Sequence, residues 1–349
     1  FPVMLSLGPL IGAIAAGNRA MIKLSEFTPH TNAVLRTLLA QVFGDDEVVV
    51  IEGDAGLAAA FSTLPFDHLL FTGSTAVGRL VMAAAAPQLT PLTLELGGKS
   101  PCLIAPDMPL ALAVERMIFG KSLNAGQICV APDYVLLPRG QEQAFIEAYQ
   151  AHFRRLYPKG LDSPDYGSII NAAQYERLTA WLAEAKQAGA QAHPCASPAR
   201  DDGARRLVPH LLTEVPGHCQ LMQQEIFGPL LPLVPYDSIE EAIAYVAARP
   251  RPLALYLMSL DETLQSRLIR ETHAGGMAIN ECLFQVAADD APFGGIGPSG
   301  MGHYHGHEGF LTFSKAKTVL RRGRFSTGNL IHPPYRRWYQ QLMMALFLR

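Results

Sequence analysis

Short apolar runs alternate with helical stretches along most of the chain. Runs of four or five aliphatic residues bounded by Gly, Pro or polar residues predict buried strands. Four such runs lie at 48–51, 68–71, 92–96 and 101–104. Alanine-rich composition, or apolar residues spaced by three or four, predicts helices at 76–86, 145–156 and 175–182. Strands of this length alternating with helices predict an α/β fold with a mainly parallel sheet.

The chain opens with another apolar run, Phe1-Pro2-Val3-Met4-Leu5, which we interpret as a strand. No initiator Met precedes this run, and a domain rarely begins inside a strand. We therefore expect the chain to be a fragment or processed product whose upstream part is absent.

A domain boundary is expected near Gly97-Gly98, and after Ala287 the chain becomes rich in glycine and loop-like. We therefore expect a nucleotide-type unit over 1–97, a second α/β domain over 98–290, and a C-terminal segment over 291–349.

Composition excludes several classes of protein. The 349 residues are 49% hydrophobic and 17% charged, with a formal net charge of −3. An average soluble protein has roughly 25% charged residues, so this chain is too apolar to be disordered. It is also too balanced in charge to bind nucleic acid through bulk charge. No apolar run approaches the ~20 residues that span a bilayer, and none is typical of a signal peptide.

The five cysteines form neither a disulfide framework nor a structural zinc site. Their number is odd and no two are spaced as Cys-x-x-Cys. A reducing cytoplasm is therefore the expected location. His303, His305 and His307 alternate along the sequence, but their glycine-rich surroundings favour a surface loop over a metal site, and we expect no metal.

Two glycine-containing turns raise the question of phosphate binding. The segment 71–78, Phe-Thr-Gly-Ser-Thr-Ala-Val-Gly, reads as a strand, a turn and a helix start, which would direct backbone N–H groups at an anion. An ordinary N-capped helix explains the same residues. Gly97-Gly98-Lys99-Ser100 lacks the earlier glycine of a P-loop, because Thr93 stands at that position.

Cys129 and Glu95 are the candidates for covalent chemistry. Cys129 follows a glycine-containing turn, and Glu95 lies inside an apolar strand, where burial would raise its pKa towards the range of a general base. A cysteine nucleophile needs access and either a lowered pKa or a nearby base. A buried cysteine is more often an inert small apolar residue, and a strand glutamate often points to solvent. Together the two residues indicate covalent catalysis followed by base-assisted release.

Four ordered motifs strongly resemble those of the aldehyde dehydrogenase superfamily. They are Leu-Glu-Leu-Gly-Gly-Lys-Ser-Pro at 94–101, Asn-Ala-Gly-Gln-Ile-Cys at 124–129, Gln-Glu-Ile-Phe-Gly-Pro at 224–229, and the glycine-rich stretch 292–302. Cys129 lies 34 residues after Glu95, as in that family. The segments 129–134 and 304–306 are similar to the class 3 branch, and bacterial coniferyl-aldehyde dehydrogenases look most similar.

The resemblance implies a mechanism. The Cys129 thiolate attacks the aldehyde carbon to give a thiohemiacetal, and loss of a hydride to a nicotinamide gives a thioester. Glu95 matches the general base that activates water to hydrolyse the thioester. The presence of Glu95 argues against the acylating relatives, which release the thioester to coenzyme A.

The resemblance also implies a cofactor. Lys23 and Glu26 match residues that hold the adenosine ribose, and a carboxylate there favours a free 2′-hydroxyl group, so we expect NAD. Class 3 relatives also accept NADP. The other implied contacts are Gly73, Ser74 and Gly78 beside the pyrophosphate, Glu225 on the nicotinamide ribose, and Phe227 near the ring. The expected architecture is thus an aldehyde-dehydrogenase-like α/β fold. It comprises a Rossmann-type NAD-binding domain at 1–97, incomplete at its N-terminus, a catalytic domain at 98–290, and a C-terminal return with oligomerisation segment and tail at 291–349.

One family residue would lie just before the chain. In the family an Asn precedes the aromatic–Pro pair that Phe1-Pro2 resembles, and its amide helps to form the oxyanion hole. Loss of one such donor costs about 10²–10³ in turnover in a well-studied case. We therefore expect slow turnover from this chain alone.

The implied substrate is an aromatic or medium-chain apolar aldehyde, coniferyl aldehyde among them. The expected assembly is a homodimer without nucleic acid or a membrane span. Two other functions stay open. One is a non-catalytic nicotinamide-binding paralogue, and the other is a cysteine hydrolase or thioesterase that needs no cofactor.

Overall fold

The computed structural model describes residues 1–325 and 327–347. The expected segment 291–349 includes Ser326, Leu348 and Arg349, which lie outside the described residues. The chain divides into two units, 1–314 and 315–349, and each is described by itself.

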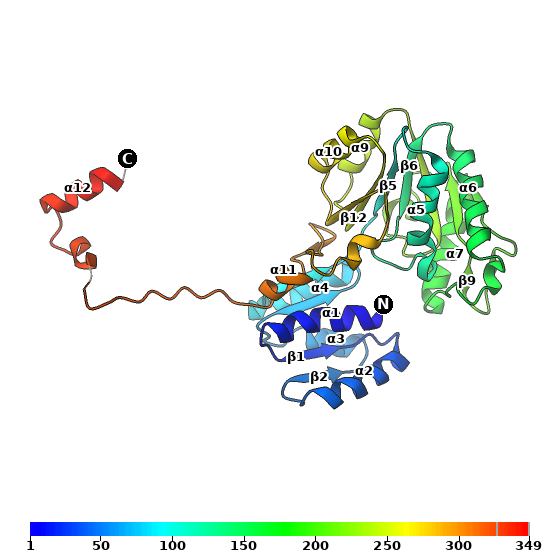
Figure 1. The fold of residues 1–349 in the computed structure, drawn as a ribbon. Coiled ribbons are helices and arrows are strands. Elements are labelled where there is room, and N and C mark those ends of the chain that lie inside the picture. The colour runs from blue at the N-terminus through cyan, green and yellow to red at the C-terminus, as the bar shows by residue number, and fades with distance from the viewer. Residues whose placement is uncertain (326, 348–349) are drawn as a thin grey trace. The chain divides into compact units, whose positions relative to one another are not determined.

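The first hundred residues alternate short parallel strands with helices. The elements are α1 (Pro2–Ala15), β1 (Ala20–Lys23), α2 (Pro29–Val42), β2 (Val48–Ile51), α3 (Ala55–Phe61), β3 (Leu69–Thr72), α4 (Thr75–Ala85), the short 3₁₀ helix η1 (Ala86–Gln88) and β4 (Leu92–Glu95). Strand β1 pairs with β2 and β3 with β4, both in parallel. The late strand β14 (Gly300–Met301) pairs antiparallel with β4, so the chain returns to this region near its end (Figure 1).

The first residues are helical, so our interpretation of Phe1–Leu5 as a strand was wrong. The apolar run continues as the 14-residue helix α1, and a run of that length fits a helix rather than a strand. Pro2 stands in the first turn, where its missing N–H is not needed, and the Ser6 hydroxyl donates to the Pro2 carbonyl at 2.6 Å.

The middle of the chain forms one seven-stranded sheet in the order β13-β12-β5-β6-β11-β10-β7. All its pairs are parallel except β10–β7, at the edge. The strands are β5 (Pro101–Ile104), β6 (Tyr134–Pro138), β7 (Gln191–Pro194), β10 (His210–Thr213), β11 (Leu230–Tyr236), β12 (Ala254–Met258) and β13 (Gly276–Ile279). A small hairpin, β8 (Arg200–Asp201) and β9 (Arg206–Leu207), lies outside this sheet.

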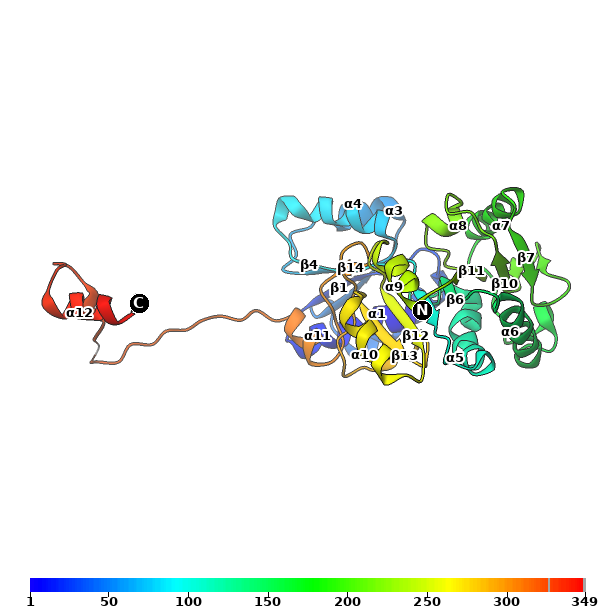
Figure 2. The same ribbon diagram turned by 90° about the horizontal axis from the view of Figure 1, so that it is seen from above.

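Helices cover both faces of this sheet (Figures 1 and 2). On one face α5 (Leu110–Ser122), α6 (Glu142–Leu156) and α7 (Ala172–Gln187) bury the larger apolar core. On the other, α9 (Ile239–Ala247) and α10 (Glu262–Glu271) bury a second core. The remaining elements of this unit are η2 (Leu123–Gly126), η3 (Gly160–Asp162), α8 (Gln220–Gln223), η4 (Phe284–Ala287) and α11 (Gly306–Thr312). The other predicted strands and helices correspond to observed elements, and the parallel α/β architecture is confirmed.

The second unit, 315–349, contains η5 (Thr327–Ile331) and α12 (Trp338–Phe347). Among the described residues, no helix combines the length and the apolar character that a bilayer crossing demands.

Candidate active site

A left-handed turn carries Cys129 out of the end of α5. Asn124, Ala125 and Gly126 have successive φ values of 51°, 54° and 73°. These left-handed values interrupt the right-handed helical conformation of the preceding residues. Gly126 is required there, because a Cβ would lie 2.6 Å from the carbonyl oxygen of Gly228. Cys129 follows in an irregular turn, and the residue as a whole is partly buried.

Glu95 is the last residue of β4 and lies between two neighbouring strands. It is opposite Thr72 of β3 and Gly300 of β14, and only 3% of its surface is exposed. Neither carboxylate oxygen has a hydrogen-bond partner within the described part of the chain. Burial raises the pKa of Glu95 to about 9. The carboxyl group is therefore a stronger base, once ionised, than an ordinary glutamate.

Cys129 lies within electrostatic reach of two carboxyl groups. Burial, followed by the charges of Glu225 and Glu95, raises the pKa of the Cys129 thiol to about 12, against a smaller lowering by nearby backbone N–H groups. The start of α1 also lies within electrostatic reach of Cys129. The structure therefore brings together Cys129, Glu95, Glu225 and the start of α1.

Glu225 occupies the space that a side chain at Gly97 would fill. A Cβ at Gly97 would lie 1.8 Å from Oε2 of Glu225. Burial and the charge of Asp133 raise the pKa of Glu225 to about 8, while the backbone N–H of Gly98 and the nearby Lys99 and Arg177 act in the opposite direction. Gly97 thus leaves space for the Glu225 carboxylate, and the backbone N–H of Gly98 stabilises its charge. The Gly-Gly-Lys-Ser motif is therefore not a phosphate loop.

Lys99 and Asp133 fasten the segment that carries Glu225. The Lys99 ammonium pairs with the Asp133 carboxylate and also donates to the carbonyl oxygens of Leu221 at 2.6 Å and Gln224 at 3.1 Å. The other Asp133 oxygen accepts from the backbone N–H of Ile226 at 2.8 Å. Both charges are largely buried. Sequence reasoning missed Asp133, although it is the first acidic residue after the candidate cysteine.

The segment after β3 forms the predicted turn and helix start. The Ser74 hydroxyl caps α4 by accepting from the N–H of Val77 at 3.4 Å. A Cβ at Gly78 would lie 2.5 Å from the Leu96 side chain, so this glycine allows α4 to approach the segment that follows β4. Gly73 follows the carboxyl end of β3, the edge at which open α/β sheets bind ligands.

Lys23 and Glu26 form an ion pair at the carboxyl end of β1, with 2.8 Å between Nζ and Oε2. The hydrogen bond from Lys23 lowers the pKa of Glu26 and keeps it ionised. Phe227 has a φ of 47° and is 41% exposed. A bulky residue in the left-handed region is strained, and such strain clusters at functional sites.

Two further site residues escaped sequence reasoning. Tyr304 is 2% exposed, and its pKa is raised by burial and by the charges of Glu95 and Cys129, which places it near both. Its ring packs edge-on against Phe293 and His305. The sequence feature that could have identified Tyr304 was its place in the segment 304–306, which is similar to the class 3 branch. Lys121, buried at the end of α5, lies near Asp133 and Glu225 and gave no signal in the sequence.

The three alternating histidines have separate surroundings. His303 faces Glu308 at 3.3 Å, His305 stacks on Phe293, and His307 lies by Phe310. Across residues 1–325 and 327–347, no cluster of three or more His, Cys, Asp or Glu side chains is arranged to hold a metal ion.

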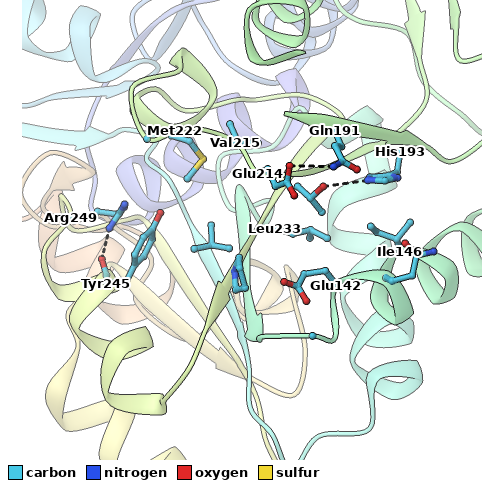
Figure 3. Close-up of a pocket in the computed structure, with 16 residues that line it drawn as sticks. Glu142, Ile146, Gln191, His193, Glu214, Val215, Met222, Leu233, Tyr245 and Arg249 are labelled. Atoms are coloured by element: carbon cyan, nitrogen blue, oxygen red, sulfur yellow. Dashed lines mark hydrogen bonds between the residues drawn. The ribbon is translucent and has the colours of Figure 1, made fainter. Parts of the chain in front are cut away.

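The cavity in Figure 3 lies elsewhere. It has a volume of about 630 Å³ and is lined by polar residues of several elements, among them Glu142, His193, Glu214 and Arg249. None of the predicted site residues lines it. The chemistry therefore gathers around Cys129 and not in this cavity.

The sequence matches known proteins over nearly its whole length. The aldehyde dehydrogenase family matches residues 1–319. A protein of Pseudomonas aeruginosa named probable coniferyl aldehyde dehydrogenase is 53% identical over 349 residues, covering 100% of this chain and 73% of the relative. Aldehyde dehydrogenase family 3 member A2 of Rattus norvegicus is 40% identical over 338 residues, covering 96% of this chain and 68% of the relative.

Solved structures match the fold. The substrate-bound state of Staphylococcus aureus AldH gives a TM-score of 0.92 at 42% identity, covering 100% of this chain and 75% of that one. Mycobacterium tuberculosis aldehyde dehydrogenase complexed with NAD⁺ gives a TM-score of 0.83 at 30% identity, covering 93% and 68% respectively. Both likenesses agree with the resemblance drawn from the four sequence motifs.

Proposed function

The chain belongs to the class 3 branch of the aldehyde dehydrogenase family of oxidoreductases, and on this premise we propose that it oxidises an aldehyde to the carboxylic acid through a covalent bond to Cys129. The observation that carries the proposal is the gathering of Cys129, Glu95 and Glu225 at one site. A thiol nucleophile and a carboxylate base of raised pKa are the groups that this chemistry requires.

The residues at the strand ends fit a nicotinamide dinucleotide. Lys23 and the ionised Glu26 suit the adenosine ribose, and the turn of Gly73 and Ser74 before α4 suits the pyrophosphate. We assign the nicotinamide end to Glu225, whose carboxylate fills the space that a side chain at Gly97 would take, and to the exposed Phe227. NAD supplies the acceptor for the hydride that leaves the aldehyde carbon. The carboxylate of Glu26 favours NAD over NADP. Class 3 relatives accept NADP as well as NAD.

The first step is attack by Cys129. The Cys129 thiol loses its proton to solvent, and its sulfur, as the thiolate, bonds to the aldehyde carbon. The start of α1, near Cys129, favours the negative charge that forms there. The carbonyl oxygen takes up a proton from solvent and the adduct is a thiohemiacetal. Loss of the hydride to the nicotinamide and of that proton to solvent leaves a thioester on Cys129.

Glu95 completes the reaction. Its carboxylate takes a proton from water, the water oxygen bonds to the thioester carbon, and the carbon–sulfur bond breaks. The acid leaves, Glu95 releases its proton to solvent, and Cys129 is returned as the thiolate. The unpartnered oxygens of Glu95 support this role, because both are free to accept a hydrogen bond from water.

The substrate we propose is an aromatic or medium-chain apolar aldehyde, with coniferyl aldehyde as the first to test. The name of the Pseudomonas aeruginosa relative supports this choice. We also propose that the protein is a cytoplasmic homodimer, since its five cysteines are free thiols and the resemblance to class 3 implies a dimer. The division at 1–97, 98–290 and 291–349 remains part of this proposal.

The test mixes the protein with NAD and coniferyl aldehyde and follows NADH by absorbance and the acyl adduct by intact mass. We expect NADH and an adduct on Cys129, and neither with Cys129→Ala. Loss of a catalytic nucleophile lowers turnover by about 10⁶ in a well-studied enzyme. Cys219→Ala, which removes a buried thiol outside the site, is the control and should retain activity. NADH formation by Cys129→Ala at the unaltered rate would refute the mechanism.

A further inference from the structure

Three oxygen atoms at the carboxyl ends of β3 and β4 are buried without a hydrogen-bond partner. They are Oγ1 of Thr72, the last residue of β3, and both carboxylate oxygens of Glu95, the last residue of β4. None of the three bonds to another group within residues 1–325 and 327–347. Buried polar groups are nearly always paired, with protein or with water, because desolvation without compensation is costly. The cluster therefore calls for a functional explanation.

The register of the sheet sets the two side chains next to each other. Strands β3 and β4 are parallel, and Thr72 is the register partner of Glu95. Neighbouring strands lie ~4.8 Å apart, and the side chains of register partners point to the same face of a sheet. The Thr72 hydroxyl and the Glu95 carboxylate thus face the same space from adjacent strands.

The packing of neighbouring residues identifies this face. Phe71 of β3 and Leu94 of β4 pack in the core formed with α4. Because side chains alternate between faces along a strand, Thr72 and Glu95 point away from α4. Leu70, two residues before Thr72, packs against the larger apolar core on that second face. The three oxygens therefore lie between β3, β4 and the larger core, on one side of the sheet.

The backbone around Glu95 is fixed on both sides. On the β3 side, the Gly73 N–H donates to the Glu95 carbonyl oxygen at 3.0 Å. On the β14 side, the register partner of Glu95 is Gly300, where a Cβ would lie 2.3 Å from the Leu94 carbonyl oxygen. Because Gly300 presents no side chain, Thr72 is the register neighbour whose side chain can share a ligand with Glu95.

A single water molecule matches these oxygens. An ionised carboxylate only accepts hydrogen bonds, and a threonine hydroxyl oxygen can also accept one. A buried water typically bonds about three polar groups that otherwise lack partners. When such a water donates one hydrogen to Glu95 and the other to Thr72, the lone pairs of its oxygen remain free. That orientation is the one in which water can attack a carbonyl carbon.

We propose that Thr72 is a second ligand of the hydrolytic water, its hydroxyl oxygen accepting one hydrogen of the water while the Glu95 carboxylate accepts the other. The inference rests on the role proposed for Glu95. The hydrogen held by Glu95 moves to its carboxylate as a proton, the water oxygen bonds to the thioester carbon, and the bond from that carbon to the Cys129 sulfur breaks. The hydrogen held by Thr72 stays on the oxygen and leaves with the acid. Thr72 thus orients the water and transfers no proton.

The experiment measures hydrolysis of the acyl enzyme without hydride transfer. Cys129 is acylated with para-nitrophenyl acetate, the released nitrophenolate is followed by absorbance, and peptide mass follows the loss of the acetyl group from Cys129. We expect Thr72→Val to be acylated at the unaltered rate and to lose the acetyl group about tenfold more slowly, the scale of one hydrogen bond. Thr90→Val is the matched control, because Thr90 lies between η1 and β4 and also has a buried hydroxyl without a partner in the described part of the chain. The control should lose the acetyl group at the unaltered rate.

Stability and a conservative variant separate this role from a structural one. Exchange of an unpartnered buried hydroxyl for a methyl group costs little stability, so the melting temperatures of Thr72→Val and Thr90→Val should not fall. Thr72→Ser retains the hydroxyl and should hydrolyse the acyl enzyme at nearly the unaltered rate, whereas Thr72→Ala should be as slow as Thr72→Val. The Ser and Ala variants decide the matter if the Val variant does not fold.

A double variant tests whether the two residues act on one water. Added to Glu95→Gln, Thr72→Val should slow hydrolysis no further. Hydrolysis by Thr72→Val at the unaltered rate, or losses that multiply in the double variant, would overturn the inference and leave the proposed function intact. Failure of the unaltered protein to be acylated at Cys129 would instead count against the proposed function.

Discussion

Three acidic groups of the site have pKa values raised by burial: Cys129 to about 12, Glu95 to about 9 and Glu225 to about 8. Their negative charges also repel one another, so ionisation of one opposes that of the next. A base of raised pKa accepts a proton from a thiol or a water more readily than an ordinary carboxylate does. The roles of Cys129 and Glu95 can therefore be separated by removing one group at a time.

Glu95→Gln should stop the reaction after one turnover. The amide cannot take a proton from water, so the thioester forms on Cys129 and persists. We expect a burst of one NADH per site, followed by a steady rate reduced roughly 10²–10⁴-fold, the usual contribution of general acid–base catalysis. Stopped-flow absorbance measures the burst, and Glu176→Gln, an exposed change, is the control. A steady rate equal to that of the unaltered protein would show that another group activates the water.

Glu95 should also make the free energy of unfolding depend on pH. Because the pKa of Glu95 is raised from an ordinary value of 4.5 to about 9 in the folded protein, the folded form holds an extra proton between these values. Stability therefore falls as pH rises through this range. Glu95→Gln should melt higher than the unaltered protein at pH 9 by ~2–4 °C for each kcal/mol gained, the scale for domains of 150–250 residues. The gain should shrink towards pH 5, as thermal unfolding at the two pH values would show. An equal gain in melting temperature at pH 9 and at pH 5 would contradict the raised pKa of the buried Glu95 carboxyl group.

At the scale of elements, the chemistry lies where strands and helices end. Lys23 ends β1, Glu95 ends β4, and Cys129 follows the turn after α5. The end of β4 at Glu95 is readable from sequence, because its apolar run stops at a pair of glycines, whereas Lys23 was identified only through the resemblance to the family. The helix α1 was misread because five apolar residues show no period, and only the length of the full run distinguishes helix from strand. Asp133 was missed for another reason, since its role depends on burial and on partners distant in the sequence, Lys99 and the N–H of Ile226.

Asp133→Ala should loosen the segment that carries Glu225. The change leaves the buried Lys99 without its carboxylate and the Ile226 N–H without its acceptor. Breaking a buried pair in this way costs about 3–5 kcal/mol. Asp237→Ala, which breaks the exposed pair with Arg139, should cost about 0–1 kcal/mol. Denaturant unfolding measures both, and equal losses would mean that the Lys99–Asp133 pair does not fasten the segment.

At the scale of the whole molecule, charge is divided unevenly along the chain. Residues 315–349 contain eight Lys and Arg residues and no Asp or Glu, although the chain as a whole has a net charge of −3. The start of this unit, 315–325, forms neither helix nor strand, and its side chains are exposed. The unit therefore joins the rest of the chain through a basic, extended segment.

That joining segment should be the first place that trypsin cuts. Proteases need an extended, exposed stretch, and 315–325 presents Lys315, Lys317, Arg321, Arg322 and Arg324 without backbone pairing. Lysines and arginines of 1–314 lie mostly on helices, on strands or in short turns. Brief digestion should therefore yield one large fragment ending between Lys315 and Arg324, detected by intact mass before any internal cut. Arg200 and Arg205, in the β8–β9 hairpin, provide the internal comparison. Cleavage there at the same rate would mean that the joining segment is protected, and that the basic unit packs against another surface in solution.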